Sequence, residues 1–399
     1  MEILKDNKSR QNGRLNLKRT LNDETGRQQR LSQIEGLCGE PLKSFHFSPV
    51  SAESLKGNIE NFIGSVHIPV GLAGPLKFQF IDGEEEIYAP LATSEGALVS
   101  SVVRGALSLT MSNGVTTRVL SNRMIRAPQF EFGNVDEAII FCQWVQNHFE
   151  TLKKKTKDHS NHAVLLELDT KVFGKTAHIR FIYSTGDAAG QNMTTFVTSG
   201  LCRWIVEHFT TQKEIVIRDF LIEGNLSSDK KASALSAIDG RGRSVVAEAL
   251  IKRQVLKKIL RLTPEEMVSR FSRSKSSRIF TGQIGYNINV SNAIAALFLA
   301  TGQDMACVHE CSVGEFHIEQ QGEDLYVCLY MPCLIVGTVG GGSRLTSAQD
   351  CLRMMDCLGA GKADRLAQII AGFALALEMS TVSAIGSGDF VQAHQRLGR

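Results

Sequence analysis

Apolar residues recur at helical spacing in several segments of the chain and alternate with polar residues in others. The helical pattern predicts helices over 31–39, 135–155, 192–209, 289–302 and 363–385. Short apolar pieces bounded by Gly and Pro predict strands over 60–80, 163–172, 175–184 and 214–222. Residues 316–336 read as an antiparallel pair with its turn at Gln321–Asp324. Helices grouped beside antiparallel strands predict an α+β fold.

Residues 90–104, PLATSEGALVSSVVR, predict a loop that turns into an apolar helix. Thr93 and Ser94 are favourable N-cap residues, which would put Glu95 in the first helical turn. The helix dipole favours a carboxylate there, whereas burial in a closed cleft would oppose its ionisation. Glu95 is therefore a candidate proton donor as well as a candidate solvated glutamate.

Composition narrows the class of protein. The 399 residues carry a net charge of +3, too little for a nucleic-acid binder. Nine cysteines without a CxxC pair predict reduced thiols and a cytoplasmic location. The spacing of Cys307, His309 and Cys311 is not that of a zinc site, so no metal is expected. The absence of an uninterrupted run of 18 apolar residues predicts no membrane contact.

Four further segments carry residues suited to chemistry. Asp229, Lys230 and Lys231 share a polar loop, and Asp304 follows the apolar helix at 289–302. The sequence GTVGGGS occupies 337–343, and His394 lies five residues from the end of the chain. Each has an ordinary structural alternative, such as a solvated lysine pair, a helix-ending aspartate, a glycine turn or a surface histidine.

Taken together, these segments resemble the catalytic portion of the class I 3-hydroxy-3-methylglutaryl-coenzyme A (HMG-CoA) reductase family. The resemblance runs in the family's order from about Glu60 to Arg399. It is carried by ENFIGSVHIPVGLAGPL, PLATSEGALVSS, DAAGQNM, DKK, GQD, GTVGGGS and the terminal VQAH. Several of these motifs are long, so chance agreement is implausible.

The resemblance implies a two-step reduction of the HMG-CoA thioester to mevalonate and CoA, with two NADPH consumed. Lys230 matches the family's catalytic lysine, which stabilises negative charge on the thioester oxygen. Glu95 matches the proton donor to that oxygen and would need a raised pKa. Asp304 matches the residue that hydrogen-bonds both, and His394 matches the histidine that protonates the departing CoA thiolate.

The resemblance also implies binding residues. Those matching substrate contacts are Arg126 for the free carboxylate, Lys231 and Asn292 nearby, and Ser101 and Arg104 for CoA. Those matching NADPH contacts are Asp187, Asn192, Gly337, Thr338, Gly340, Gly341, Gly342 and, at the 2′-phosphate, Arg399. The family's active site lies between subunits, so a homodimer or larger assembly is implied.

The resemblance further implies an organisation in four parts. Residues 1–59 form an N-terminal arm and small helical region, with a polar arm to about residue 25. Residues 60–127 and 222–399 form a large domain around the apolar helix that ends at Asp304. Residues 128–221 form an inserted, ferredoxin-like NADP-binding domain. A Rossmann fold is disfavoured because no strand–GxGxxG–helix unit is present.

The sequence departs from the family pattern at several positions. DAAGQNM lacks two methionines, Glu223 replaces a small hydroxyl residue, and Asn289 stands where many members have histidine. Lys275 or Arg273 could serve as the family's lysine before GQIGYN. Glu223 and Asn289 motivate one alternative, a reductase for a different acyl-CoA. A second alternative is a non-catalytic CoA- or nucleotide-binding homologue.

Overall fold

The computed structural model describes residues 23–388 and residue 395. Most of the expected N-terminal arm lies outside these residues, as does the short terminal helix expected to carry His394. The ordered helices are α1 (Glu24–Cys38), α2 (Lys43–His46), α3 (Leu98–Thr110), α4 (Val135–Asn147), α5 (Phe149–Lys155), α6 (Gln191–Lys213), α7 (Ala234–Asp239), α8 (Arg253–Val255), α9 (Pro264–Lys275), α10 (Arg278–Thr281), α11 (Val290–Thr301), α12 (Val308–Cys311), α13 (Thr346–Met354) and α14 (Ala363–Ser387). Short turns of helix occur at η2 (Glu53–Leu55), η3 (Thr156–Asp158), η4 (Leu256–Leu260), η5 (Met305–Cys307) and η6 (Gly341–Arg344).

Ten strands of the described chain form one sheet, whose main path runs β7-β4-β6-β3-β8-β10-β9. Beside this path, β1 pairs with β2 and β3, and β5 pairs with β6. The strands are β1 (Val70–Phe80), β2 (Gly83–Ala92), β3 (Val115–Arg126), β4 (Gln129–Glu131), β5 (Val164–Phe173), β6 (Thr176–Ser184), β7 (Asp219–Leu221), β8 (Gly242–Ile251), β9 (Glu315–Gln321) and β10 (Asp324–Leu334). All pairings are antiparallel except that of β1 with β3, which confirms a mixed α and β fold with a largely antiparallel sheet.

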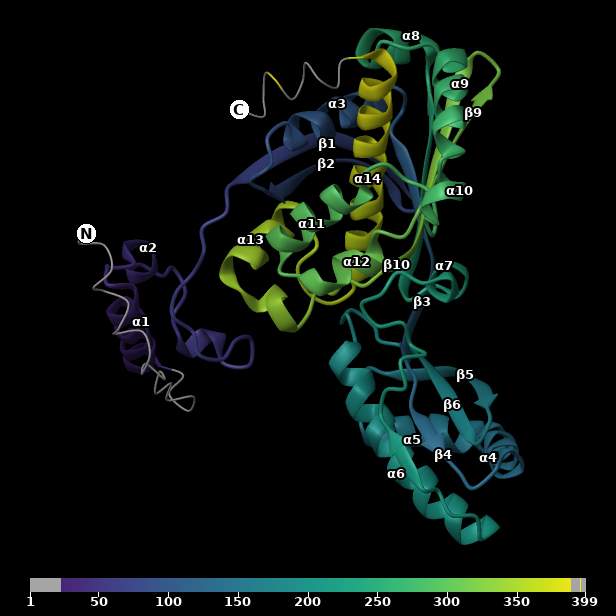
Figure 1. The fold of residues 1–399 in the computed structure, drawn as a ribbon. Coiled ribbons are helices and arrows are strands. Elements are labelled where there is room, and N and C mark those ends of the chain that lie inside the picture. Colours follow the sequence, from purple (N-terminus) through teal and green to yellow (C-terminus); the bar gives the residue numbers. More distant parts are fainter. Residues whose placement is uncertain (1–22, 389–394, 396–399) are drawn as a thin grey trace, which may run out of the picture.

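Strand β3 connects two parts of the sheet. Its residues 116–123 pair with β8, and its last three residues, 124–126, pair with β6. Figure 1 shows β3 descending from the part that contains α14 to the part that contains α4, α5 and α6. Arg126 is therefore held at the junction of the two parts.

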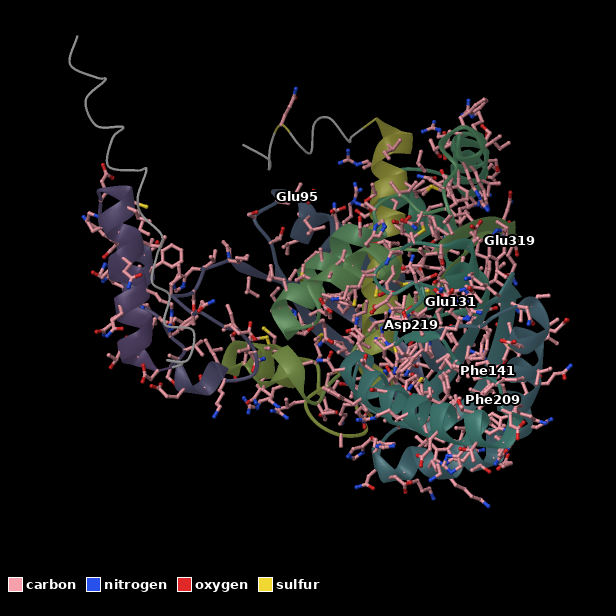
Figure 2. All side chains as sticks on the ribbon, turned by 60° about the horizontal axis from the view of Figure 1, so that its bottom comes forward. Glu95, Glu131, Phe141, Phe209, Asp219 and Glu319 are labelled. Atoms are coloured by element: carbon pink, nitrogen blue, oxygen red, sulfur yellow. The ribbon has the colours of Figure 1, made fainter. Side chains whose placement is uncertain are left out.

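Two separate hydrophobic cores fill these parts. The larger one surrounds α14, which packs against α3, α11, β3 and β8. The smaller one is aromatic and contains Phe130, Phe132, Phe141 and Phe209. Phe141 and Phe209 meet edge to face with ring centroids 5.0 Å apart, deep in the smaller part (Figure 2).

Helix α14 is long and apolar enough to cross a membrane by length and composition alone. Within the molecule, however, 89% of its most apolar window is buried against the protein. Its apolar character is thus accounted for by the larger core. Two apolar helices, α11 and α14, share the centre of this part, where the sequence had favoured the helix ending at Asp304 alone.

Several sequence-based boundaries are confirmed and others are wrong. The helix expected over 31–39 begins seven residues earlier, at Glu24. The α14 range and the turn at Gln321–Asp324 agree with expectation. Helix α3 begins at Leu98, after Ala97 in a left-handed conformation, so Glu95 precedes the helix and neither Thr93 nor Ser94 caps it. No strand forms over 60–69. Strand β7 has only three residues because its partner β4 offers only three.

Candidate active site

The Lys230 loop adopts a strained but well-anchored conformation between β7 and α7. Ser228 and Lys230 both have left-handed backbones, with φ of 56° and 60°. Such conformations cost free energy for residues other than glycine. The Lys230 N–H donates to Glu310 Oε1 at 3.0 Å, and the Lys231 N–H donates to the Ser228 carbonyl at 3.0 Å. These hydrogen bonds hold the backbone of Lys230 in place.

Lys230 forms an ion pair with Asp304. The distance from Lys230 Nζ to Asp304 Oδ2 is 2.9 Å, and both side chains are partly exposed. The hydrogen bond to Asp304 raises the pKa of Lys230. Burial alone would raise the pKa of Asp304, but hydrogen bonds from Lys230 and the Ala306 N–H lower it. Both groups therefore stay charged at neutral pH, and a fixed cation faces solvent.

Beneath this pair lies a buried charge network that the sequence did not reveal. Arg241 and Glu310 have fully buried side chains and pair at 2.7 Å, and Arg241 also reaches Asp229 at 2.9 Å. Burial raises the pKa of Glu310, and the ion pair with Arg241 opposes that shift. Glu310 stands inside the CVHEC segment, where only the cysteines and histidine had drawn attention. No local pattern marked Arg241.

We expect Glu310→Gln to destabilise the protein, because it leaves Arg241 with Asp229 as its remaining carboxylate. Losing a hydrogen bond to a charged group should lower the free energy of unfolding by about 2–3 kcal/mol. Urea unfolding would measure the change, with Glu319→Gln on the exposed end of β9 as the matched control. Equal stability of the two variants would show that the buried pair contributes little.

Glu95 lies in the loop before α3, at the edge of a separate cavity of about 350 Å³. Its side chain is exposed, and the Asn292 amide donates to Glu95 Oε1 at 3.4 Å. Its own N–H donates to Thr93 Oγ1 at 2.9 Å. In this chain, then, Glu95 has Asn292 as a neighbour but no closed cleft around it.

The same cavity brings together the residues that resemble CoA contacts. Ser101 and Arg104 line it from α3, and Asn289 lines it from the start of α11. The Ser101 hydroxyl lies 2.9 Å from the Ser380 hydroxyl, and Arg104 Nε donates to the same oxygen at 3.0 Å. These side chains thus also hydrogen-bond α3 to α14.

A buried carboxylate organises the wall of this cavity. Glu378, in the middle of α14, accepts the N–H groups of Ile288 and Asn289 at 2.7 Å each. Because these groups lie at the N-terminus of α11, Glu378 holds the helix that carries Asn292 toward Glu95. Burial raises the pKa of Glu378 to about 7, although the bonds from Asn289 and Ile288 oppose that rise.

We expect this group to make stability depend on pH. The folded-state pKa of Glu378, about 7, lies above its ordinary value of 4.5, so folding favours the protonated form. The stabilisation is complete below about pH 4.5 and is lost as the pH rises through 7, by about 3 kcal/mol in all. Urea unfolding from pH 4.5 to 8 should show this fall, and Glu378→Gln should remove it. Glu207→Gln, at an exposed position of α6, is the control and should keep the wild-type dependence of the unfolding free energy on pH. The same dependence in Glu378→Gln would contradict the assignment.

Of the three candidate catalytic residues that the structure describes, Lys230 and Asp304 pair with each other, and Glu95 has a different neighbour. Asn292, the neighbour of Glu95, lies in the first turn of α11, whereas Asp304, the partner of Lys230, follows its end. The nine helical steps from Asn292 to the end of α11 at Thr301 span ~14 Å along the axis. The expectation that Asp304 hydrogen-bonds both Lys230 and Glu95 is met only for Lys230 here. His394 lies outside the described residues.

Arg126, at the end of β3, is surrounded by protein acceptors. Its side chain is buried and lies 3.0 Å from Glu223 and 3.4 Å from Asp229. Arg126 Nη2 also donates to the Gln191 carbonyl at 3.2 Å. Lys231 is exposed and donates to the Asp229 carbonyl at 3.0 Å. Arg126 therefore lies beside the loop that carries Lys230.

A second cavity, of about 930 Å³, lies on the Asp304 side of α11. It is lined by the glycine-rich residues 337–343, by residues 188–193 and by residues 49–68 from the N-terminal region. A Cβ on Gly337 would lie 2.6 Å from Ala189 N, and one on Gly342 would lie 2.3 Å from the Gly302 carbonyl oxygen. Only glycine permits these loops to approach so closely.

The expected dinucleotide residues fall into two groups around this cavity. Asn192, Gly337, Gly340, Gly341 and Gly342 line it. Asp187 instead accepts the N–H groups of Gly361 and Ala363 and so caps α14, and the Thr338 hydroxyl donates to the Gly359 carbonyl. The described lining carries no Lys or Arg, and Arg399 lies outside the described residues.

Two remaining candidates can be placed on α9. Lys275 Nζ pairs with Glu315 at 2.7 Å, and Arg273 Nε donates to the Ser269 carbonyl. Among the described residues, no group of three His, Cys, Asp or Glu side chains is arranged to hold a metal ion. All nine cysteines are free thiols.

The fold and the paired loops define the class to which the chain belongs. Its fold resembles that of the class II HMG-CoA reductase of Streptococcus pneumoniae solved with NADPH in open conformations, with a TM-score of 0.64 and 17% identity over 90% of this chain and 96% of that one. The sequence model of hydroxymethylglutaryl-coenzyme A reductase matches residues 26–399.

Sequence comparison with individual proteins points to the same family. The HMG-CoA reductase of Aeropyrum pernix is 39% identical over 373 residues, covering 92% of this chain and 88% of that protein. The enzyme of Methanocaldococcus jannaschii is 38% identical, covering 87% of this chain and 86% of that protein. The chain belongs to the HMG-CoA reductase family.

Proposed function

We propose that this chain reduces HMG-CoA to mevalonate and CoA, consuming two NADPH and two protons. The observation that carries the proposal is the Lys230–Asp304 ion pair beside a cavity lined by the glycine-rich loop, in a member of this family. A fixed cation at that position can stabilise the oxyanion that forms when a thioester carbonyl is reduced.

The proposed catalytic roles follow from the residue types. Lys230 polarises the carbonyl oxygen, and Asp304 keeps its ammonium charged and oriented. Glu95 delivers a proton to the oxygen of the reduced carbon. His394 protonates the thiolate of CoA when the hemithioacetal breaks down, so that the thiolate does not return to the aldehyde.

The proposed substrate contacts come from two groups of residues, one beside Lys230 and one around the smaller cavity. Arg126 and Lys231, beside the Lys230 loop, bind the free carboxylate of the acyl group. Asn292 orients the substrate next to Glu95, and Ser101 and Arg104 contact CoA. The lining of the smaller cavity by Asn292, Ser101 and Arg104 supports this division.

The larger cavity suits a dinucleotide in size and in lining. Gly340 and Gly341 have left-handed backbones with open space where a Cβ would lie, so their backbone groups can approach a ligand. NADPH would supply the hydride for each reduction. Asn192 and the glycine-rich loop would hold it, and Arg399 would meet the 2′-phosphate, since guanidinium matches phosphate geometry.

We propose an assembly of at least two copies with a shared active site. The exposed position of Glu95 and its separation from Lys230 along α11 support this arrangement. Residues 128–221 form the inserted, ferredoxin-like NADP-binding domain between two segments of the large domain, 60–127 and 222–399, after an N-terminal region, 1–59. The separate aromatic core supports this division. Nine free thiols support a cytoplasmic location.

NADPH consumption with HMG-CoA, compared with acetoacetyl-CoA and succinyl-CoA, tests the proposed function. We expect HMG-CoA to be the preferred substrate, with two NADPH oxidised per CoA released. Preference for another thioester would favour the alternative of a different acyl-CoA reductase. No oxidation with any of them would favour a non-catalytic homologue.

A further inference from the structure

The positive charge of Arg126 is already paired with carboxylates of the protein itself. Its side chain is 6% exposed, and its nearest carboxylate is Glu223 Oε2 at 3.0 Å. The side chain of Glu223 is one-quarter exposed, so it borders solvent while holding a buried cation. Glu223 lies two residues after the end of β7 and also accepts the Ala127 N–H at 3.4 Å.

The Arg126–Glu223 pair is incomplete. Arg126 Nε and Glu223 Oε1 are both buried without a hydrogen-bond partner. An arginine and a carboxylate usually join through two parallel hydrogen bonds, whereas this pair uses one nitrogen and one oxygen. Buried polar groups rarely stay unpaired. Arg126 thus retains a donor for a second carboxylate that presents the better geometry.

The ion-pair network around Arg126 also contains one more carboxylate than cations. Arg126 and Arg241 are the cations of the connected ion pairs, and Asp229, Glu310 and Glu223 are the carboxylates. Without Glu223, the two cations and two carboxylates would balance. A bound ligand carboxylate would raise the surplus to two negative charges unless Glu223 moved away.

We propose that Glu223 is a specificity-determining residue that occupies Arg126 in place of a substrate carboxylate. Resting on the proposed function, the inference is that an acyl thioester with a free carboxylate binds only by displacing Glu223. A thioester without that carboxylate has no such competitor. Glu223 therefore weakens binding of the dicarboxylic substrate class and leaves binding of uncharged acyl thioesters unaffected.

Steady-state kinetics of the full chain with Glu223→Gln and Glu223→Ser tests this role. We expect the KM for HMG-CoA to fall about tenfold in both variants with little change in kcat, equivalent to removing one charge competitor. The KM for 3-hydroxy-3-methylbutyryl-CoA, which lacks the carboxylate, should stay constant. Glu131→Gln, on neighbouring β4 and ion-paired at the surface with Lys175, is the matched control and should change neither. Melting temperatures would confirm that the variants fold.

An unchanged or raised KM for HMG-CoA in both variants, or equal shifts for the two thioesters, would overturn the inference. Failure of the proposed function has a different signature. If the wild type reduces only uncharged thioesters, Glu223→Gln should gain activity with HMG-CoA. If it reduces none, calorimetric titration with free 3-hydroxy-3-methylglutarate decides: tighter binding to Glu223→Gln than to the wild type supports the inference, and equal or weaker binding refutes it.

Discussion

Replacing Lys230 with alanine should lower the turnover of HMG-CoA by about 10²–10³, the usual cost of losing one oxyanion stabiliser. The variant should remain folded, because the ammonium is partly exposed and the loop is held through backbone hydrogen bonds. Binding of NADPH should persist, since among the described residues the polar partners of Lys230 are Glu310 and Asp304 and not the glycine-rich loop. Single-turnover kinetics together with a cofactor-binding titration would measure both effects.

Lys231→Ala provides the comparison for that variant. Its ammonium donates to the Asp229 carbonyl and makes no contact with Asp304 in the structure. We expect it to raise KM more than it lowers kcat. Near-normal turnover of Lys230→Ala, with loss of turnover in Lys231→Ala, would transfer the proposed role to Lys231.

His394→Gln should separate the two chemical steps. The proposed task of His394 is to protonate the CoA thiolate, which has an ordinary pKa of about 8.5 and can otherwise re-attack the aldehyde. A general acid contributes about 10²–10⁴ in rate, so thioester reduction should fall by that factor. Reduction of added mevaldehyde releases no thiol and should be largely retained. NADPH oxidation with each substrate would measure the two half-reactions.

A purely structural contribution of the C-terminal segment predicts a different result. Both half-reactions would then fall together, and the general-acid role would be refuted. Gln395→Ala, one residue further along, is the matched control and should leave both rates near those of the wild type.

The separation of Glu95 from Lys230 gives the proposed assembly a physical reason. Helix α11 holds Asn292 near its start and Asp304 just beyond its end, so it spaces the two clusters rather than joining them. A helix is rigid along its axis, and no side-chain rotation closes ~14 Å. A second copy can supply the missing cluster to each site.

Local sequence determined the elements that depend on local forces. The α14 helix was predicted over 363–385 and found over Ala363–Ser387, because a continuous apolar face fixes a buried helix. The β9–β10 hairpin was predicted from its turn residues. The resemblance likewise brought Lys230 and Asp304 together, and the structure pairs them at 2.9 Å.

Tertiary structure decided what depends on partners distant in sequence. The start of α3 at Leu98 and the three residues of β7 were set by a left-handed turn and by a short neighbouring strand. The Arg241–Glu310 pair, the capping of α11 by Glu378 and the hold of Glu223 on Arg126 join residues 69, about 90 and 97 positions apart. Burial and charge pairing of this kind arise only when the chain is folded, because no local pattern records which charges will share a low-dielectric interior.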